Sequence, residues 1–196
     1  MRKIKMMGLA AIAATSLMAS AGVSAASAAI WDPPGVNETG NLFSATSVLT
    51  DSSNHHVFCS TSSTTLTASG SVAMAITTTN PVSFTNCGND IIGGATSVST
   101  AGTWSFHADS TTTVTATAST PGKPIATIQL AGGICTITVD GPVVIPKNTW
   151  TNASHQLHLN DSVTFPLTQS GGCFGAVGAN GRLSGTYTLP SAVVIT

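Results

Sequence analysis

Charged residues are scarce in this chain. Only 7% of its 196 residues are Asp, Glu, Lys or Arg, whereas ordinary domains have roughly 25%. Three of the six cations lie within the first five residues, and the others, Lys123, Lys147 and Arg182, are scattered. Nucleic acids and anionic membrane surfaces are recognised by clustered Lys and Arg, so we expect neither as a partner. Solubility must rest on Ser, Thr, Asn and Gly.

Long apolar runs are also missing, except at the N terminus. The first cations precede an Ala-rich apolar stretch, and small residues follow up to Ala25 and Ala28. This pattern predicts a signal-peptide helix at residues 1–28, cleaved after Ala25 or Ala28, with a retained membrane anchor as the alternative. No later stretch is apolar enough for a transmembrane helix. Removing 28 of the 196 residues leaves three cations against seven acids, a net charge of −4.

The chain has only four cysteines and no Cys-x-x-Cys pair. In an oxidising compartment four cysteines predict two disulfides, for which three pairings exist. We favour Cys59–Cys87 and Cys135–Cys173, because in each pair a strand cysteine is followed by a cysteine in a Gly/Asn-rich turn. On the chain-entropy model each disulfide would contribute about 3–4 kcal/mol. The missing Cys-x-x-Cys spacing disfavours a metal site made of the four thiolates.

Short alternating runs fill the chain after residue 42. In Gly132–Gly141, Cys135, Ile137 and Val139 share one face of an extended chain, and two threonines share the other. Turn signals such as Asn-Pro and Pro-Gly separate the runs. This pattern predicts an all-β fold, a mostly antiparallel β-sandwich of Ig-like or jelly-roll-like type. Further apolar stripes are formed by Val72, Met74 and Ile76; Val82 and Phe84; Trp104, Phe106 and Ala108; Val114, Ala116 and Ala118; Ala126, Ile128 and Leu130; Leu157 and Leu159; Val163, Phe165 and Leu167; and Leu183, Tyr187 and Leu189.

The predicted domain organisation is simple. Two prolines and a glycine after Trp31 predict an irregular N-terminal arm at residues 29–41. Trp31 either pins this arm to the domain, which we favour, or is exposed for a partner. Residues 42–196 are predicted to form one β-sandwich domain. Its two halves, which meet near residues 121–124, have a similar order of cysteines and aromatics and suggest a pseudo-repeat.

Six short segments occur in a distinctive order: Cys59–Ser63, Phe84–Cys87, Gly102–Trp104, Gly133–Gly141, Trp150–Asn152 and Gly172–Gly175. In that order they resemble a family of exported actinobacterial proteins, rich in Thr, Ser and Gly, that carry four cysteines and have no assigned function. The resemblance covers most of the predicted β domain. It implies an exported, disulfide-bonded β protein, and it assigns no activity, cofactor or functional residue.

Five histidines raise metal and catalytic hypotheses. His55 and His56 are adjacent, so on a strand they point to opposite faces. His155 and His158, together with Asp161, are the candidate ligands of a metal site. We favour the simpler interpretation that the histidines are surface residues of a charge-poor protein. The sequence implies no metal and no cofactor.

Catalytic motifs are absent as well. The chain has no Gly-x-Ser-x-Gly elbow for a serine nucleophile. Its seven acids stand mostly beside Gly or Asn, and Asp90 and Asp140 are typical turn residues. A small secreted hydrolase that uses His107, His155 or His158 with an Asp is therefore a minor alternative. We expect a protein that is not an enzyme.

Aromatic residues make up 5% of the chain. Trp150 lies in the polar stretch Pro146–Asn152, so we expect it to be exposed and propose it as the first candidate binding residue, with Trp31 as the second. Core packing is the alternative role, which the alternation of Trp104 with Phe106 favours. A carbohydrate-stacking platform could be formed by four rings: Trp31, Trp104, Trp150 and Tyr187.

The leading functional hypothesis is an exported, non-enzymatic binding or structural module at the cell surface or in the medium. The sequence does not identify its ligand, and a carbohydrate or cell-wall polymer is favoured over a nucleic acid. An oligomeric β-barrel pore subunit is the first alternative, because Thr-rich strands and low charge would suit it. Most runs are, however, shorter than the roughly 9–11 residues of a transmembrane strand, and aromatics for interfacial girdles are few. The hydrolase is the second alternative.

Overall fold

The computed structural model describes residues 29–32, 43–44, 47–68, 75–78, 80–120, 124–173, 177–189 and 193–196. The predicted signal-peptide helix, most of the predicted arm, and residues 121–123 of the predicted boundary lie outside them. Among the described residues, no helix has the length and apolar character needed to cross a membrane.

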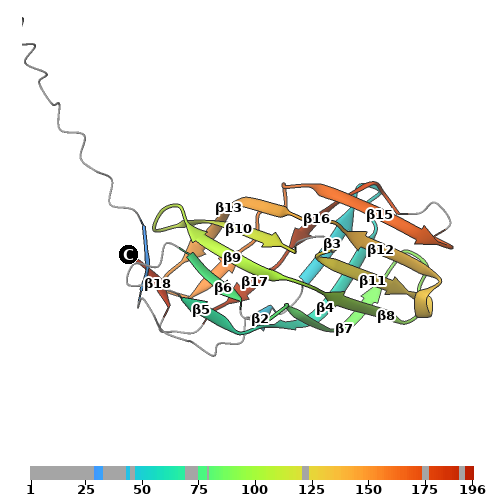
Figure 1. Cartoon of the computed structure of the whole chain (residues 1–196), viewed down its shortest axis with the longest axis horizontal. Helices are drawn as coiled ribbons and strands as arrows, with labels where there is room; N and C mark the ends of the chain where they lie inside the picture. Colours follow the sequence, from blue (N-terminus) through green and yellow to red (C-terminus); the bar gives the residue numbers. More distant parts are fainter. Residues whose placement is uncertain are drawn as a thin grey trace, which may run out of the picture.

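The fold is all-β, antiparallel and sandwich-like, as the sequence predicts. Figure 1 shows the described strands in an elongated body. Two eight-stranded sheets account for most of it, and β1 (Trp31–Asp32) pairs with β18 (Val194–Ile195) at one end. A short 3₁₀ turn, η1 (Ala131–Gly133), interrupts the strands.

The first sheet occupies the left half of Figure 1. In spatial order its strands are β2 (Phe43–Ser44), β17 (Thr186–Thr188), β14 (Gln156–His158), β13 (Val143–Thr151), β10 (Thr113–Ser119), β9 (Thr103–Ala108), β6 (Ala75–Thr78) and β5 (Leu66–Ala68).

The second sheet occupies the right half of Figure 1, and its edge strands β7 and β8 contact each other, so that it curls into a near-barrel. Two strand pairs, β4–β5 and β16–β17, are almost continuous and carry the chain from one sheet to the other. The strand order is β7 (Ser83–Asn89), β4 (His56–Ser63), β3 (Ser47–Asp51), β16 (Asn180–Ser184), β15 (Phe165–Gly171), β12 (Cys135–Val139), β11 (Ala126–Leu130) and β8 (Thr96–Thr100).

Strand β12 confirms the clearest prediction from the sequence. Its residues Cys135, Ile137 and Val139 are buried, and Thr136 and Thr138 are half-exposed. β12 pairs with β11 on one side and β15 on the other, through five residue pairs each. The same alternation buries Val114, Ala116 and Ala118 of β10, so both sheets turn an apolar face inward.

Both predicted disulfides are formed. Cys59–Cys87 joins two directly paired residues of β4 and β7, and Cys135–Cys173 joins β12 to the segment after β15. The expectation that Cys87 lies in a turn is wrong, because residues 86–88 continue β7 in register with β4. The Asn-Gly dipeptide at residues 180–181, a pair common in turns, instead begins β16.

Trp31 pins the N-terminal segment to the domain, as favoured from the sequence. Its side chain is buried, and its indole Nε1 donates a hydrogen bond to the Phe106 carbonyl oxygen at 2.9 Å. Its ring meets the edge of Trp150, with 5.1 Å between centroids. The start of the predicted irregular arm is thus the short paired strand β1, which corrects the prediction at residues 31–32.

A β-bulge in β13 changes which side chains of that strand face inward. Between the pairs Val114–Asn148 and Ala116–Ile145, β13 has two residues, Pro146 and Lys147, whereas β10 has one. Lys147 adopts a φ of +60°. The extra residue shifts the alternation, so odd-numbered residues point inward before the bulge and even-numbered ones after it. Asn148 and Trp150 are consequently buried.

Asn148 satisfies the backbone groups around this bulge. Its Nδ2 donates to the carbonyl oxygens of Val114 at 2.9 Å and Ile145 at 2.6 Å, and its Oδ1 accepts from the Asn160 N–H at 2.9 Å. The side chain is completely buried, so loss of these bonds would strand polar groups away from water.

Asn148→Ala is expected to lower the free energy of unfolding by about 3 kcal/mol, because it leaves two carbonyls and one N–H without partners. Urea unfolding followed by tryptophan fluorescence measures the change. Thr149→Ala, at the exposed neighbouring position, is the control and should change stability far less. Equal losses in the two variants would contradict the structural role of Asn148.

Candidate functional site

The two tryptophans proposed as binding residues are both buried. Trp150 and Trp31 are each 1% exposed, and they pack against each other at the end of the body that carries β1 and β18. The expected exposure of Trp150 is therefore wrong, because the β13 bulge turns its side chain inward. A buried indole cannot stack on a sugar, and neither residue is a candidate for carbohydrate binding in this fold.

Each of three histidines contacts a nearby carboxylate through Nδ1. The pairs are His55–Asp51 at 3.3 Å, His56–Asp90 at 2.7 Å and His107–Asp109 at 3.3 Å.

The other two histidines contact different groups. His155 Nδ1 lies 3.0 Å from the Val193 carbonyl oxygen, and His158 Nδ1 lies 2.8 Å from the Thr186 hydroxyl. Within the described ranges no three His, Cys, Asp or Glu side chains are close enough to hold a metal ion. The candidate set of His155, His158 and Asp161 is thus not brought together.

Asp51 is a buried carboxylate at the end of β3 with several donors. Its Oδ1 accepts from the Ser53 and His55 N–H groups, and its Oδ2 from the Gly178 N–H, each at 2.8 Å. Burial alone would raise the pKa of Asp51, but these donors and the His55 ring outweigh burial and lower the pKa below the ordinary value of an Asp. A Cβ on Gly178 would come 2.8 Å from the Ser52 nitrogen, so glycine permits this close approach.

The other two pairs also tie turns together. Asp90 contacts both the backbone N–H and the ring of His56, which links the end of β7 to the start of β4. Burial alone would raise the pKa of Asp90, but these contacts with His56 outweigh burial and lower it. Asp109 accepts a hydrogen bond from the Thr115 hydroxyl and also contacts the His107 ring. Each His–Asp pair therefore has a structural explanation that requires no catalytic role.

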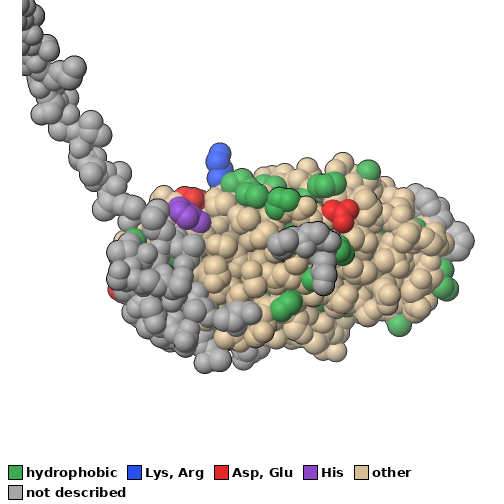
Figure 2. All heavy atoms as spheres, viewed as in Figure 1, with side chains coloured by type: hydrophobic (Ala, Val, Ile, Leu, Met, Phe, Trp, Pro, Cys, Tyr) green, Lys and Arg blue, Asp and Glu red, His purple; other side chains and the backbone are tan. Residues whose placement is uncertain are grey.

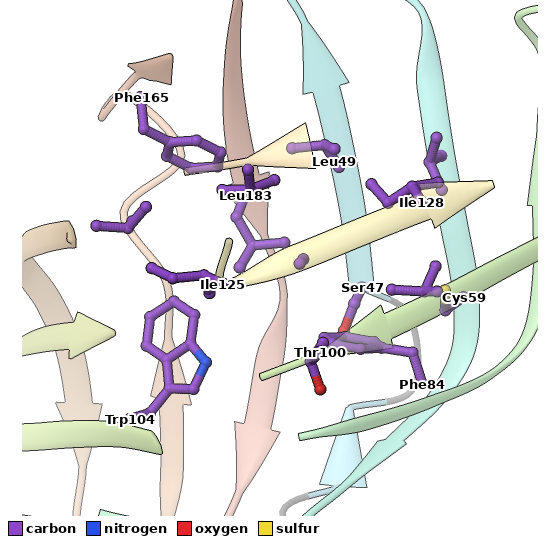
Figure 3. Close-up of a pocket in the computed structure, with 15 residues that line it drawn as sticks. Ser47, Leu49, Cys59, Phe84, Thr100, Trp104, Ile125, Ile128, Phe165 and Leu183 are labelled. Carbon is purple, nitrogen blue, oxygen red and sulfur yellow. The ribbon is translucent and has the colours of Figure 1, made fainter. Parts of the chain in front are cut away.

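An apolar cavity lies between the inner faces of the strands. Its volume is about 70 Å³, and strands of both sheets contribute side chains to it. Figure 3 shows Trp104 beside Ile125 at one end, with Phe165, Leu49 and Ile128 pointing into the space from other strands. An empty cavity of this size would cost roughly 1.7 kcal/mol of stability, at about 24 cal/mol per Å³.

A smaller cavity of about 20 Å³ adjoins the first and shares Phe84, Trp104 and Leu183 with it. It extends toward Tyr187, whose hydroxyl lies 3.1 Å from the Ser47 hydroxyl. Burial raises the pKa of Tyr187, so this phenol stays neutral in the interior. Trp104 itself is half-buried, and its ring stacks on Phe106 with 6.4 Å between centroids.

The outer face of the near-barrel carries a regular array of uncharged polar side chains on β8, β11, β12 and β15. The strand register aligns them in two rows that run across the strands. The first row consists of Ser99, Thr127, Thr138 and Thr168, and the second of Ser97, Gln129, Thr136 and Ser170. This Ser/Thr face consists of Ser97, Ser99, Thr127, Gln129, Thr136, Thr138, Thr168 and Ser170.

Comparison of the chain with protein-family models, curated proteins and solved structures finds no match to any of them. The resemblance to exported actinobacterial proteins therefore stays a prediction. Two features of the described residues support a functional argument, the Ser/Thr face and the apolar cavity.

Of the four strands of the Ser/Thr face, sequence reasoning identified β11, β12 and β15 but not β8, and it identified neither the face nor the cavity. Alternating Thr on residues 136 and 138 indicated a solvated face, but its extension across four strands depends on their order in space. The donors to Asp51 include Gly178, 127 residues away, and no local pattern points to that contact.

Asp51→Asn is expected to lower the free energy of unfolding by about 2–3 kcal/mol at neutral pH, because the amide would direct an N–H group at buried donors. The folded-state pKa is lowered, so the stabilisation is present above the ordinary pKa and disappears as the pH falls through the folded value. Urea unfolding at about pH 7 and about pH 2 should therefore show that the difference in free energy of unfolding between the wild type and Asp51→Asn is smaller in acid.

Asp140→Asn is the matched control, since this exposed carboxylate contacts the Thr168 hydroxyl at 3.3 Å. If the difference in free energy of unfolding between the wild type and Asp51→Asn were the same at both pH values, the role assigned to the Asp51 charge would be contradicted.

Proposed function

We propose that the protein is an exported, non-enzymatic binding module whose Ser/Thr face contacts a neutral carbohydrate polymer of the cell surface. The observation that carries this proposal is the alignment of eight uncharged polar side chains in two rows across four neighbouring strands. Their hydroxyl and amide groups both donate and accept hydrogen bonds, and sugar hydroxyls require both.

The spacing of the face suits a repeating ligand. Neighbouring strands lie about 4.7–4.9 Å apart, and alternate residues along one strand are about 6.6–6.8 Å apart. The two rows therefore present a grid of hydrogen-bonding groups on a surface held rigid by paired strands. Each contact with a polymer would be weak, and many simultaneous contacts would supply the affinity.

The charge of the chain supports a neutral ligand. Figure 2 shows a surface on which Lys, Arg, Asp and Glu side chains are few. Lys147 lies in β13 and Arg182 in β16, so neither belongs to the four strands of the Ser/Thr face. Among the residues that the structure describes, no cation lies on that face to attract a polyanion, whereas a neutral glycan needs none.

Two further features support export and a non-enzymatic role. Both disulfides would be maintained in an oxidising compartment outside the cytosol. The carboxylates that pair with His55, His56 and His107 each hold a turn, and the larger interior cavity is lined by apolar residues with two hydroxyls, from Ser47 and Thr100.

A binding experiment with a triple variant tests the proposal. Thr127→Val, Thr138→Val and Thr168→Val together remove three hydroxyls from one row and keep the β-branched shape that suits a strand. We expect binding to purified cell walls, or to insoluble neutral glucan or chitin, to weaken at least tenfold, since three hydrogen bonds of about 0.5–1.5 kcal/mol each are lost. Depletion of the protein from the supernatant measures the binding.

The control variant combines Thr117→Val and Thr149→Val on the outer face of the first sheet. It should bind as the wild type does. Equal binding by the triple variant and the wild type, or no binding of the wild type to any of these polymers, would contradict the proposal.

A further inference from the structure

We propose that the larger cavity binds the end of an unbranched alkyl chain, a function separate from polymer binding on the Ser/Thr face. The cavity lies on the inner side of the strands whose outer side carries that face. Its volume of about 70 Å³ exceeds the roughly 10–15 Å³ that one water molecule needs. It thus has room for several methylene groups but not for a bulky ring system.

The chemistry of the lining specifies an apolar ligand. Thirteen of the fifteen lining residues are apolar, and the other two, Ser47 and Thr100, already have hydrogen-bond partners within the protein. No Asp, Glu, Lys, Arg or His lines the cavity within the part of the chain that the structure describes. A charged or strongly polar group would lose its hydration there without compensation, so the head group of the ligand must stay outside.

The shape of the interior space favours a linear chain. The smaller cavity continues from the larger one past Phe84, Trp104 and Leu183 toward Tyr187. Burial of each methylene group contributes to binding through the hydrophobic effect, and the ligand would also fill a space that is destabilising when empty.

Trp104 provides a local probe for this site. It lines both cavities, whereas Trp31 and Trp150 pack against each other where β1 and β18 lie. Titration with ω-bromododecanoic acid, whose terminal bromine quenches indole fluorescence on contact, should quench part of the emission and reach saturation. Trp104→Phe should abolish this component and leave the emission of the other two tryptophans unquenched.

Ala126→Leu is the variant that blocks the site, because it fills part of the cavity from β11 without adding polarity. We expect the fatty acid to bind roughly tenfold more weakly, which corresponds to the loss of about two buried methylene groups. The fatty acid should also raise the melting temperature of the wild type more than that of the variant. Val98→Phe fills the same cavity from β8 and replaces Ala126→Leu if that variant misfolds.

Saturable quenching that depends on Trp104 and requires roughly tenfold more fatty acid in the filled variant supports the proposal. Quenching that does not saturate, that persists in Trp104→Phe, or that is equally strong in the filled variant and the wild type would overturn it. Equal binding of the Thr127, Thr138 and Thr168 triple variant and the wild type to the fatty acid would show that the two sites act independently.

Discussion

The register of β12 between β11 and β15 is the constraint on which the rest of the structure depends. Side chains on a strand alternate between faces, so a shift of one residue would turn Cys135, Ile137 and Val139 outward and bury two threonines. The disulfide to Cys173 opposes such a shift, because Cys135 must point inward to form it. The apolar cavity and the Ser/Thr face are opposite sides of this one arrangement.

The scarcity of charged side chains on the Ser/Thr face underlies the proposed function. In most domains, charged side chains cover the solvated face of a sheet, but here Ser, Thr and Gln cover the outer face of β8, β11, β12 and β15. Hydroxyls keep that face wet without attracting ions, and β-branched threonine also suits the strand backbone. The same residues therefore supply strand propensity and form the surface that we propose contacts neutral glycans.

The sequence predicted what is local and missed what depends on distant pairing. Period-two alternation identified β10, β11 and β12, because inward and outward residues follow each other directly along the chain. Trp150 was misplaced because the extra residue at the β13 bulge, opposite β10, reverses the alternation. Cys87 was assigned to a turn from its Asn and Gly neighbours, yet those residues pair with β4, where the Phe58 ring covers Gly88.

The central claim, that the outer face of the near-barrel is the binding surface, is tested most directly by NMR of threonine methyl groups. Soluble oligosaccharides released from the cell wall would be titrated into the folded protein. The methyl signals of Thr127, Thr138 and Thr168 should shift together, and those of Thr117 and Thr149 on the other sheet should stay in place. Shifts confined to the other sheet, or spread evenly over both, would contradict the account.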